Sequence, residues 1–233
     1  MLSQLLRGGF SEMNMADLLL HLAAVCFIVF CTLPVHEAAH AWMAKKLGDN
    51  TAWMHGRLTL NPMKHIDWMG ALLILLVGFG YAKPVPVNPR NFNNPKRDMA
   101  LVALAGPVSN LMMGLVLCFL STALYVVAGR LGSEFISFVS SFFYSAAFIN
   151  VSLAVFNLIP IPPLDGSRIL NVLLPDRLYW KVMRYEGYLR IGILLLLLLG
   201  VLTAPLMWLT NLIMSGFFAV TALPFAAQGF MSL

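Results

Sequence analysis

The sequence predicts an all-α polytopic membrane protein with about four to six transmembrane helices and a small interfacial β or re-entrant element. Of its residues, 60% are hydrophobic and only 11% are charged, whereas an average soluble domain carries roughly 25% charged residues. Mean hydropathy is +0.81. Apolar stretches of roughly 20 residues, the length that spans a bilayer as a helix, recur along the chain.

Four apolar regions account for this fold class. The predicted spans run from about Ala16 to Met43, from about Asp98 to Val127 and from about Phe138 to Phe156. A fourth region, Ile191 to Phe225, is interrupted by Pro205, so it predicts either one kinked helix or two short ones.

Residues 1–233 are expected to form a single transmembrane domain, because no Gly/Ser linker, repeat or low-complexity segment divides them. The apolar run from Leu18 to Leu33 exceeds a typical signal-peptide core and is read as a membrane span. The cysteines lack CxxC spacing, so they predict neither a disulfide framework nor a thiolate zinc site: Cys26, Cys31 and Cys118.

The interval from Gly70 to Tyr81 is about 12 residues long, too short to span as a helix, and fits a re-entrant or interfacial piece. On either side of it, Arg57–Asn61 and Ala82–Val87 alternate polar residues or proline with apolar residues. Such alternation is typical of short edge strands. An ordered interfacial loop explains the pattern equally well.

The basic residues predict the orientation in the membrane. Arg7 and Arg130 fall on one side, whereas the remaining 13 of the 15 Lys and Arg residues lie between Lys45 and Arg97 or between Arg168 and Arg190. By the positive-inside rule the N-terminus lies outside and both basic loops are cytoplasmic. This topology explains the net charge of +5, so no nucleic-acid partner is expected; the lipid bilayer is the expected partner.

Near the inner end of the first span lies His36-Glu37-Ala38-Ala39-His40, an HExxH motif. On a helix, residues at i and i+4 share one face, so both imidazoles can bind one Zn²⁺ while Glu37 reaches its water. Two histidines and a glutamate are costly in lipid unless they pair or bind something. The alternative is a polar cluster that only joins helices. His55 and His65 are expected to be surface or interfacial residues and not ligands.

Asp165 follows the third span within a proline-rich segment that breaks the helix. An ordinary turn residue before Gly166 is the alternative. Since the first and third spans run in the same direction, His36, His40 and Asp165 are expected at similar depth. Two histidines, one carboxylate and an open fourth position form a catalytic zinc pattern.

The sequence resembles the site-2 protease family of intramembrane zinc metalloproteases, peptidase family M50. The resemblance rests on three stretches: the HExxH motif, Ala105-Gly106-Pro107-Val108-Ser109-Asn110, and Asn157 to Gly166. It implies that His36, His40 and Asp165 bind zinc, that Glu37 is the catalytic base, and that Asn157 is the family's asparagine upstream of the Asp-Gly pair. The chain looks like a compact member without a PDZ or CBS domain.

The expected function is zinc-dependent intramembrane endopeptidase activity, in which metal-activated water cleaves transmembrane segments of single-span membrane proteins. Asn157 is a candidate oxyanion donor, and Asn110 is a second; either could instead only bridge helices. The competing functions are a metal-ion transporter and a catalytically inactive binding module. The expected location is a prokaryotic cell (inner) membrane, with the active site near the cytoplasmic side.

Overall fold

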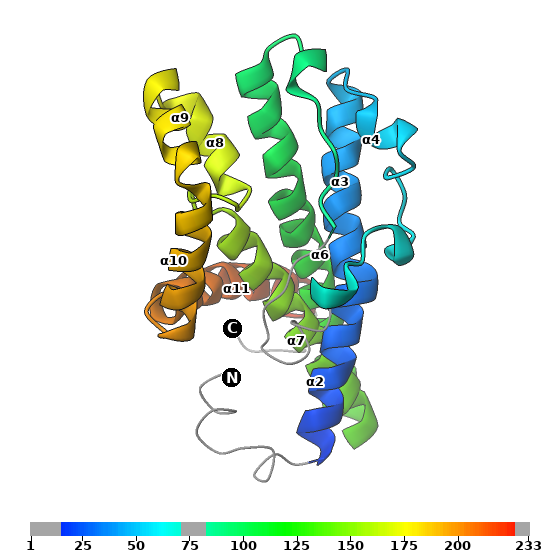
Figure 1. Cartoon of the computed structure of the whole chain (residues 1–233). Helices are drawn as coiled ribbons and strands as arrows, with labels where there is room; N and C mark the ends of the chain where they lie inside the picture. The colour runs from blue at the N-terminus through cyan, green and yellow to red at the C-terminus, as the bar shows by residue number, and fades with distance from the viewer. Residues whose placement is uncertain (1–14, 71–82, 227–233) are drawn as a thin grey trace.

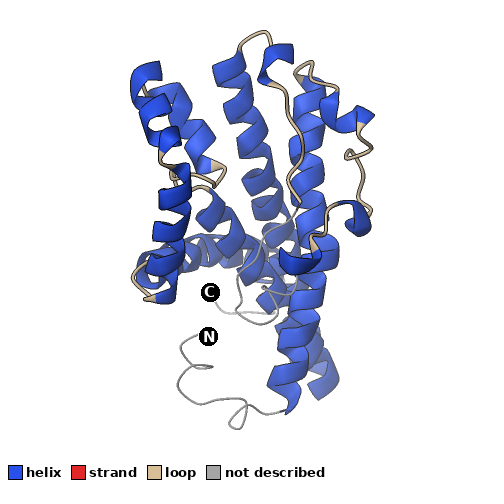
Figure 2. Ribbon diagram, in the orientation of Figure 1, coloured by secondary structure: helices blue, strands red, loops and turns tan. Residues whose placement is uncertain are grey.

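The computed structural model describes residues 15–70 and 83–226 (Figure 1). Within these ranges the elements are helices, and no strand occurs (Figure 2). In chain order the elements are α2 (Met15–Phe27), the π-helical turn η2 (Ile28–Thr32), α3 (Leu33–Lys46), α4 (Thr51–Met54), the 3₁₀ turns η3 (Pro62–Lys64) and η4 (Pro89–Asn91), α6 (Pro95–Leu131), α7 (Glu134–Asn157), α8 (Gly166–Leu173), α9 (Asp176–Arg184), α10 (Glu186–Leu198) and α11 (Thr203–Ala226).

In the described chain, four helical stretches are long and apolar enough to cross a membrane: Leu22–Lys46, Pro95–Leu131, Glu134–Asn157 and Thr203–Ala226. The first three match the predicted spans, and the chain is an integral membrane protein. The fourth apolar region forms two helices, but α11 is not short, since it has 24 residues and contains Pro205. The break lies at Gly200, where φ is 74°, because Pro205 falls in the first turn of α11 and removes no helical hydrogen bond there.

Helices α2 and α3 continue one another through the π-helical turn η2 (Figure 1). Pro34 lies at the start of α3 and has no N–H to donate. Just before it, the N–H of Leu33 donates to the carbonyl of Ile28, five residues back. Single π turns of this kind are frequent beside functional sites, and this one immediately precedes the HExxH motif.

Helices α6 and α7 form a tight hairpin. The Asn94 side chain caps the start of α6, and Gly132 ends it in the left-handed conformation that glycine adopts without strain. Ser133 then caps α7. The core between them and α11 is made largely of small or slender side chains, which let the helices approach closely: Leu117, Cys118, Ala146, Ala147, Val151, Val155 and Met214.

Helix α6 is the centre of the molecule. It packs against α3, α7, α8 and α11, and in Figure 1 α3 and the α8–α10 group lie on opposite sides of it, with α11 lying across the bundle. Because α3 and α8 both pack against α6, side chains from α3 and from the segment before α8 can meet beside it.

The loop after α3 is ordered by Asp49, which is fully buried. Its carboxylate accepts hydrogen bonds from the backbone and hydroxyl of Thr51, the backbone of Asn88 and the side chain of Asn91. Burial opposes ionisation of Asp49, but these hydrogen bonds outweigh it and hold the pKa of the carboxyl below its usual range. The loop and the 83–91 segment are thus fixed to the end of α3.

The short strands predicted for this region are not confirmed. Residues 57–61 and 83–88 are irregular backbone, tied together by hydrogen bonds from Arg57 to the carbonyl of Lys83 and from the N–H of Lys83 to His65. His65 was expected to be a surface or interfacial residue, and it does not lie at the surface: the ring is fully buried and hydrogen-bonded to the carbonyl of Thr59. Apart from Gly70, the predicted re-entrant interval lies outside the described residues.

Candidate metal centre

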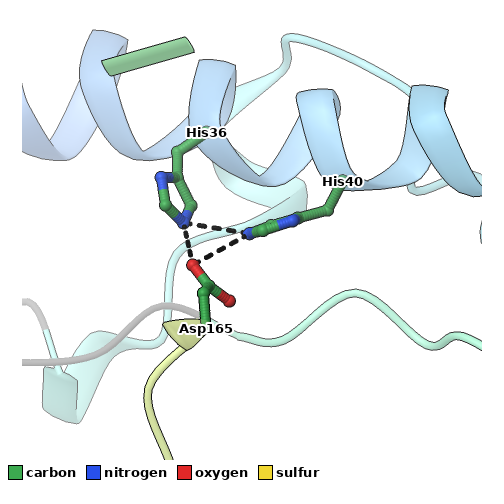
Figure 3. A group of neighbouring side chains, drawn as sticks. All are labelled: His36, His40 and Asp165. Carbon is green, nitrogen blue, oxygen red and sulfur yellow. Dashed lines mark hydrogen bonds and ion pairs between the residues drawn. The ribbon is translucent and has the colours of Figure 1, made fainter. Parts of the chain in front are cut away.

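Helix α3 presents His36 and His40 one turn apart on the same face (Figure 3). Both rings are buried, at 6% and 8% exposure, and their Nε2 atoms lie 3.0 Å from each other. The rings are nearly perpendicular, with an interplanar angle of 84°. The helical spacing thus aims two potential metal-binding nitrogens at one point.

Asp165 approaches this point from the segment between α7 and α8. The backbone turns back so sharply there that a Cβ at Gly166 would collide with the carbonyls of Leu158 and Ile159. Its Oδ2 lies 3.2 Å from Nε2 of His36 and 3.4 Å from Nε2 of His40 (Figure 3). The Asp165 side chain keeps 23% exposure, so the cluster is accessible from this side.

The three ligand atoms fit a zinc ion. Around tetrahedral zinc, ligands at about 2.0–2.1 Å lie about 3.3 Å from one another, and the measured separations are 3.0, 3.2 and 3.4 Å. Oδ2 of Asp165 is buried yet accepts no well-aligned hydrogen bond from the described residues. Two imidazole nitrogens and one carboxylate oxygen leave a fourth position free, as catalytic zinc sites do.

The second nitrogen of His40 has a built-in partner. Nδ1 lies 2.7 Å from the carbonyl oxygen of Val102 on α6. A carbonyl can only accept, so Nδ1 carries the proton and Nε2 keeps its lone pair for a metal. Such a partner behind a metal-binding histidine fixes its tautomer and ring orientation.

Gly106 of α6 lies against both rings. A Cβ at this position would lie 2.6 Å from Cε1 and Nε2 of His36 and closer still to Nε2 of His40. Because only glycine leaves this space, α6 can cover the histidines while leaving room between them and Asp165.

All of the predicted site residues lie in the described part of the chain. His36, His40 and Asp165 converge within 4.8 Å, and Glu37, which follows His36 on α3, is half-buried. Asn157 is the half-buried last residue of α7. Asn110 lies inside the helix bundle at 1% exposure.

Several residues of this site were not predicted individually. Val102 acts through its backbone, which no side-chain pattern reveals. Gly106 belongs to the Ala105–Asn110 stretch, but its role depends on the close approach of α3, which the sequence alone does not show. Thr32 is buried one turn before His36, and Asn150 is buried on α7; they form a hydrogen bond of 3.2 Å. A polar residue within each of these apolar spans was the sequence feature that could have indicated them.

Comparison with known proteins gives an independent line of evidence. The model of the family described as "Peptidase family M50" matches residues 124–199, which include Asn157 and Asp165. The chain is 44% identical over 154 residues to "Putative zinc metalloprotease YwhC" of Bacillus subtilis, covering 66% of this chain and 70% of that protein. No solved structure matches the chain.

More distant relatives bear similar names. "Putative zinc metalloprotease Rip2" of Mycolicibacterium smegmatis is 33% identical over 140 residues, which cover 58% of this chain and 51% of that protein. The Rip2 protein of Mycobacterium tuberculosis is 31% identical over 146 residues, covering 60% and 53%. The match therefore spans about half the length of the Rip2 proteins.

Proposed function

Because this chain belongs to peptidase family M50, the site-2 protease family, and is a zinc metalloprotease, we propose that it is an intramembrane endopeptidase that cleaves transmembrane segments of membrane-anchored proteins. The observation that carries the proposal is the convergence of His36, His40 and Asp165 within 4.8 Å. Two of these residues lie in a helix long and apolar enough to cross the membrane. A hydrolytic site at that place would meet peptide bonds that soluble proteases do not reach.

We assign zinc binding to Nε2 of His36, Nε2 of His40 and Oδ2 of Asp165. When bound, zinc supplies Lewis-acid polarisation of the scissile carbonyl and lowers the pKa of a water molecule. Glu37, next to His36 on α3, takes the proton from the attacking water and returns it to the leaving amine. Its partial burial and its position beside the ligands support this role.

Asn157 is proposed to donate a hydrogen bond to the oxyanion that develops on the substrate carbonyl. Its side chain is half-buried at the end of α7, where the chain turns toward Asp165. Asn110 is less suited to this role, because at 1% exposure it is out of a substrate's reach.

The substrate must be locally extended, since a helix hides its peptide bonds in its own hydrogen bonds. The 83–88 segment offers an edge for such a strand. The N–H groups of Val85 and Val87 donate to no described residue, and the Val87 side chain packs against the cluster that contains Ala44 and Val102. Because Val102 also contacts His40, a substrate paired here would run toward the metal. Unchanged cleavage by Val87→Pro would contradict this pairing.

We propose that the N-terminus lies outside a prokaryotic cell (inner) membrane and that the site lies near the cytoplasmic side. Lys45 and Lys46 end α3, and Arg97 lies in the first turn of α6, so basic residues gather at one end of both helices. A reporter fused after Arg130 should read as outside, and one near Lys181 as cytoplasmic. The reverse pattern would overturn the orientation.

The decisive experiment separates metal binding from catalysis. Glu37→Gln keeps the shape of the side chain and all three proposed ligands but removes the base, so the purified protein should retain about one zinc per chain. Cleavage of a single-span substrate in proteoliposomes should fall roughly 10²- to 10⁴-fold. Near-normal proteolysis by Glu37→Gln would overturn the proposed mechanism, whereas a metal transporter would not cleave the substrate even as the wild-type protein.

A further inference from the structure

The two histidines of the proposed metal centre are supported differently. Nδ1 of His40 donates to the carbonyl of Val102, whereas Nδ1 of His36 is buried and has no hydrogen-bond partner among the described residues. A metal-binding histidine almost always donates its second N–H to an acceptor. His36 therefore needs an acceptor behind it.

Two buried amide oxygens in neighbouring helices also lack a partner in the described chain: Oδ1 of Asn110 on α6 and Oδ1 of Asn150 on α7. The two residues are 1% and 0% exposed. Unsatisfied buried polar atoms are rare in folded proteins, and each calls for a physical explanation.

The position of Asn110 follows from its neighbours on α6. Gly106 faces His36 and His40, while Gly114 faces Val151 of α7. At 3.6 residues per turn, Asn110 points about 40° beyond Gly106, and Gly114 about 80° beyond it. Asn110 therefore points between α3 and α7. Of the His36 ring, Cε1 and Nε2 lie nearest to Gly106 of α6. Nδ1 is bonded to Cε1, so it lies next to this edge of the ring.

Asn150 reaches the same junction from α7. Its Nδ2 donates to Oγ1 of Thr32 at 3.2 Å and to the carbonyl of Ala146 at 2.8 Å. Thr32 lies one helical turn before His36 and also contacts Met113 of α6. With both Nδ2 hydrogens engaged, the amide orientation of Asn150 is set and its Oδ1 remains as a free acceptor.

We propose that His36 Nδ1, Asn110 Oδ1 and Asn150 Oδ1, here termed the junction site, hold one buried water molecule that fixes His36 as a metal ligand. The water accepts the Nδ1–H of His36 and donates one hydrogen to each amide oxygen. Three hydrogen bonds are typical of a buried water. Asn110 and Asn150 are thus positioning residues that keep the lone pair of His36 on Nε2. The inference rests on the proposed function, through the assignment of His36 as a ligand.

Zinc affinity, measured by competition with a chelating dye on the purified full chain, tests the junction site without any activity assay. Asn110→Leu and Asn150→Leu remove one acceptor each at similar volume and should each weaken zinc binding roughly 10- to 100-fold. Because both asparagines act through one water, the zinc affinity of the double variant should be only slightly lower than that of the single variant that binds zinc less tightly. Asn110→Asp keeps the acceptor and should bind zinc at least as tightly as wild type.

Ser140→Ala is the matched control, since it removes a buried hydrogen bond elsewhere in the α6–α7 hairpin, and its zinc affinity should be unchanged. Asn→Leu affinities within twofold of wild type, single-variant losses that multiply in the double variant, or an Asn110→Asp variant as weak as Asn110→Leu would each overturn the junction site. His36→Ala distinguishes the two levels of argument. If it leaves zinc affinity intact, the proposed metal centre itself fails.

Discussion

The α6–α7 hairpin contains two buried polar clusters that differ in how completely their atoms are paired. Toward the Gly132 turn, Ser121 and Ser140 each donate to the other's backbone carbonyl, at 3.0 and 2.9 Å. Thr122 bonds within α6 and to Thr221 of α11. Toward the proposed metal centre, Asn110 and Asn150 each keep an unpaired oxygen.

The degree of hydrogen-bond pairing distinguishes polar residues that only hold helices together from polar residues that serve a ligand. Polar groups that pair completely across helices join them and need nothing more, because lipid offers no competing partner. Polar groups that stay unpaired in an apolar bundle lower stability and persist where they serve a ligand. The hydroxyl pairs should therefore affect stability alone, whereas residues around His36 and His40 should affect zinc.

The largest expected effect is at Asp165. In Asp165→Ala the two histidines remain but the third ligand is lost, and two ligands do not hold zinc at a catalytic site. Zinc measured by elemental analysis should fall far below one per chain, and cleavage should become undetectable. Full zinc content in Asp165→Ala would mean that the third ligand is misassigned.

Gly106→Ala should have an intermediate effect. Its methyl group would collide with both imidazoles, at 2.6 Å from Cε1 of His36, so the rings must shift and zinc binding should weaken about 10-fold or more. Gly129→Ala is the matched control, because it lies in the same helix and the added carbon would have nothing within 4 Å beyond the backbone of its own helical turn. Equal zinc affinities for the two variants in dye competition would remove Gly106 from the site.

Ser140→Ala should have the smallest effect. Loss of an interhelical hydrogen bond in a membrane protein costs about 0.6 kcal/mol on average, so unfolding in mixed micelles should shift slightly. Zinc content and cleavage should match wild type. A loss of zinc here would remove the distinction between the two clusters.

The sequence predicted what depends on local periodicity. The HExxH spacing placed His36 and His40 on one helical face, and span directions placed Asp165 at their depth. Val102 and Gly106 could not be predicted in the same way, because one acts through a carbonyl and the other through the absence of a side chain. The predicted edge strand at Ala82–Val87 rested on an alternation with prolines that also suits a loop. In that segment, hydrogen bonds to distant residues determine the backbone conformation, and the sequence pattern does not show them.

The position of Gly106 along α6 sets how deep the proposed active site would lie in the membrane. Its first turn carries the ion pair between Arg97 and Asp98, and such charges stay at the membrane edge. Gly106, beside the histidines, is eight residues further on, about 12 Å at the helical rise. A substrate helix of roughly 20 membrane residues, cut at that depth, would retain roughly 12 of them. That remnant is too short to span the bilayer, so a single cut would release the domain on the near side and leave the rest of the anchor unable to hold its transmembrane position.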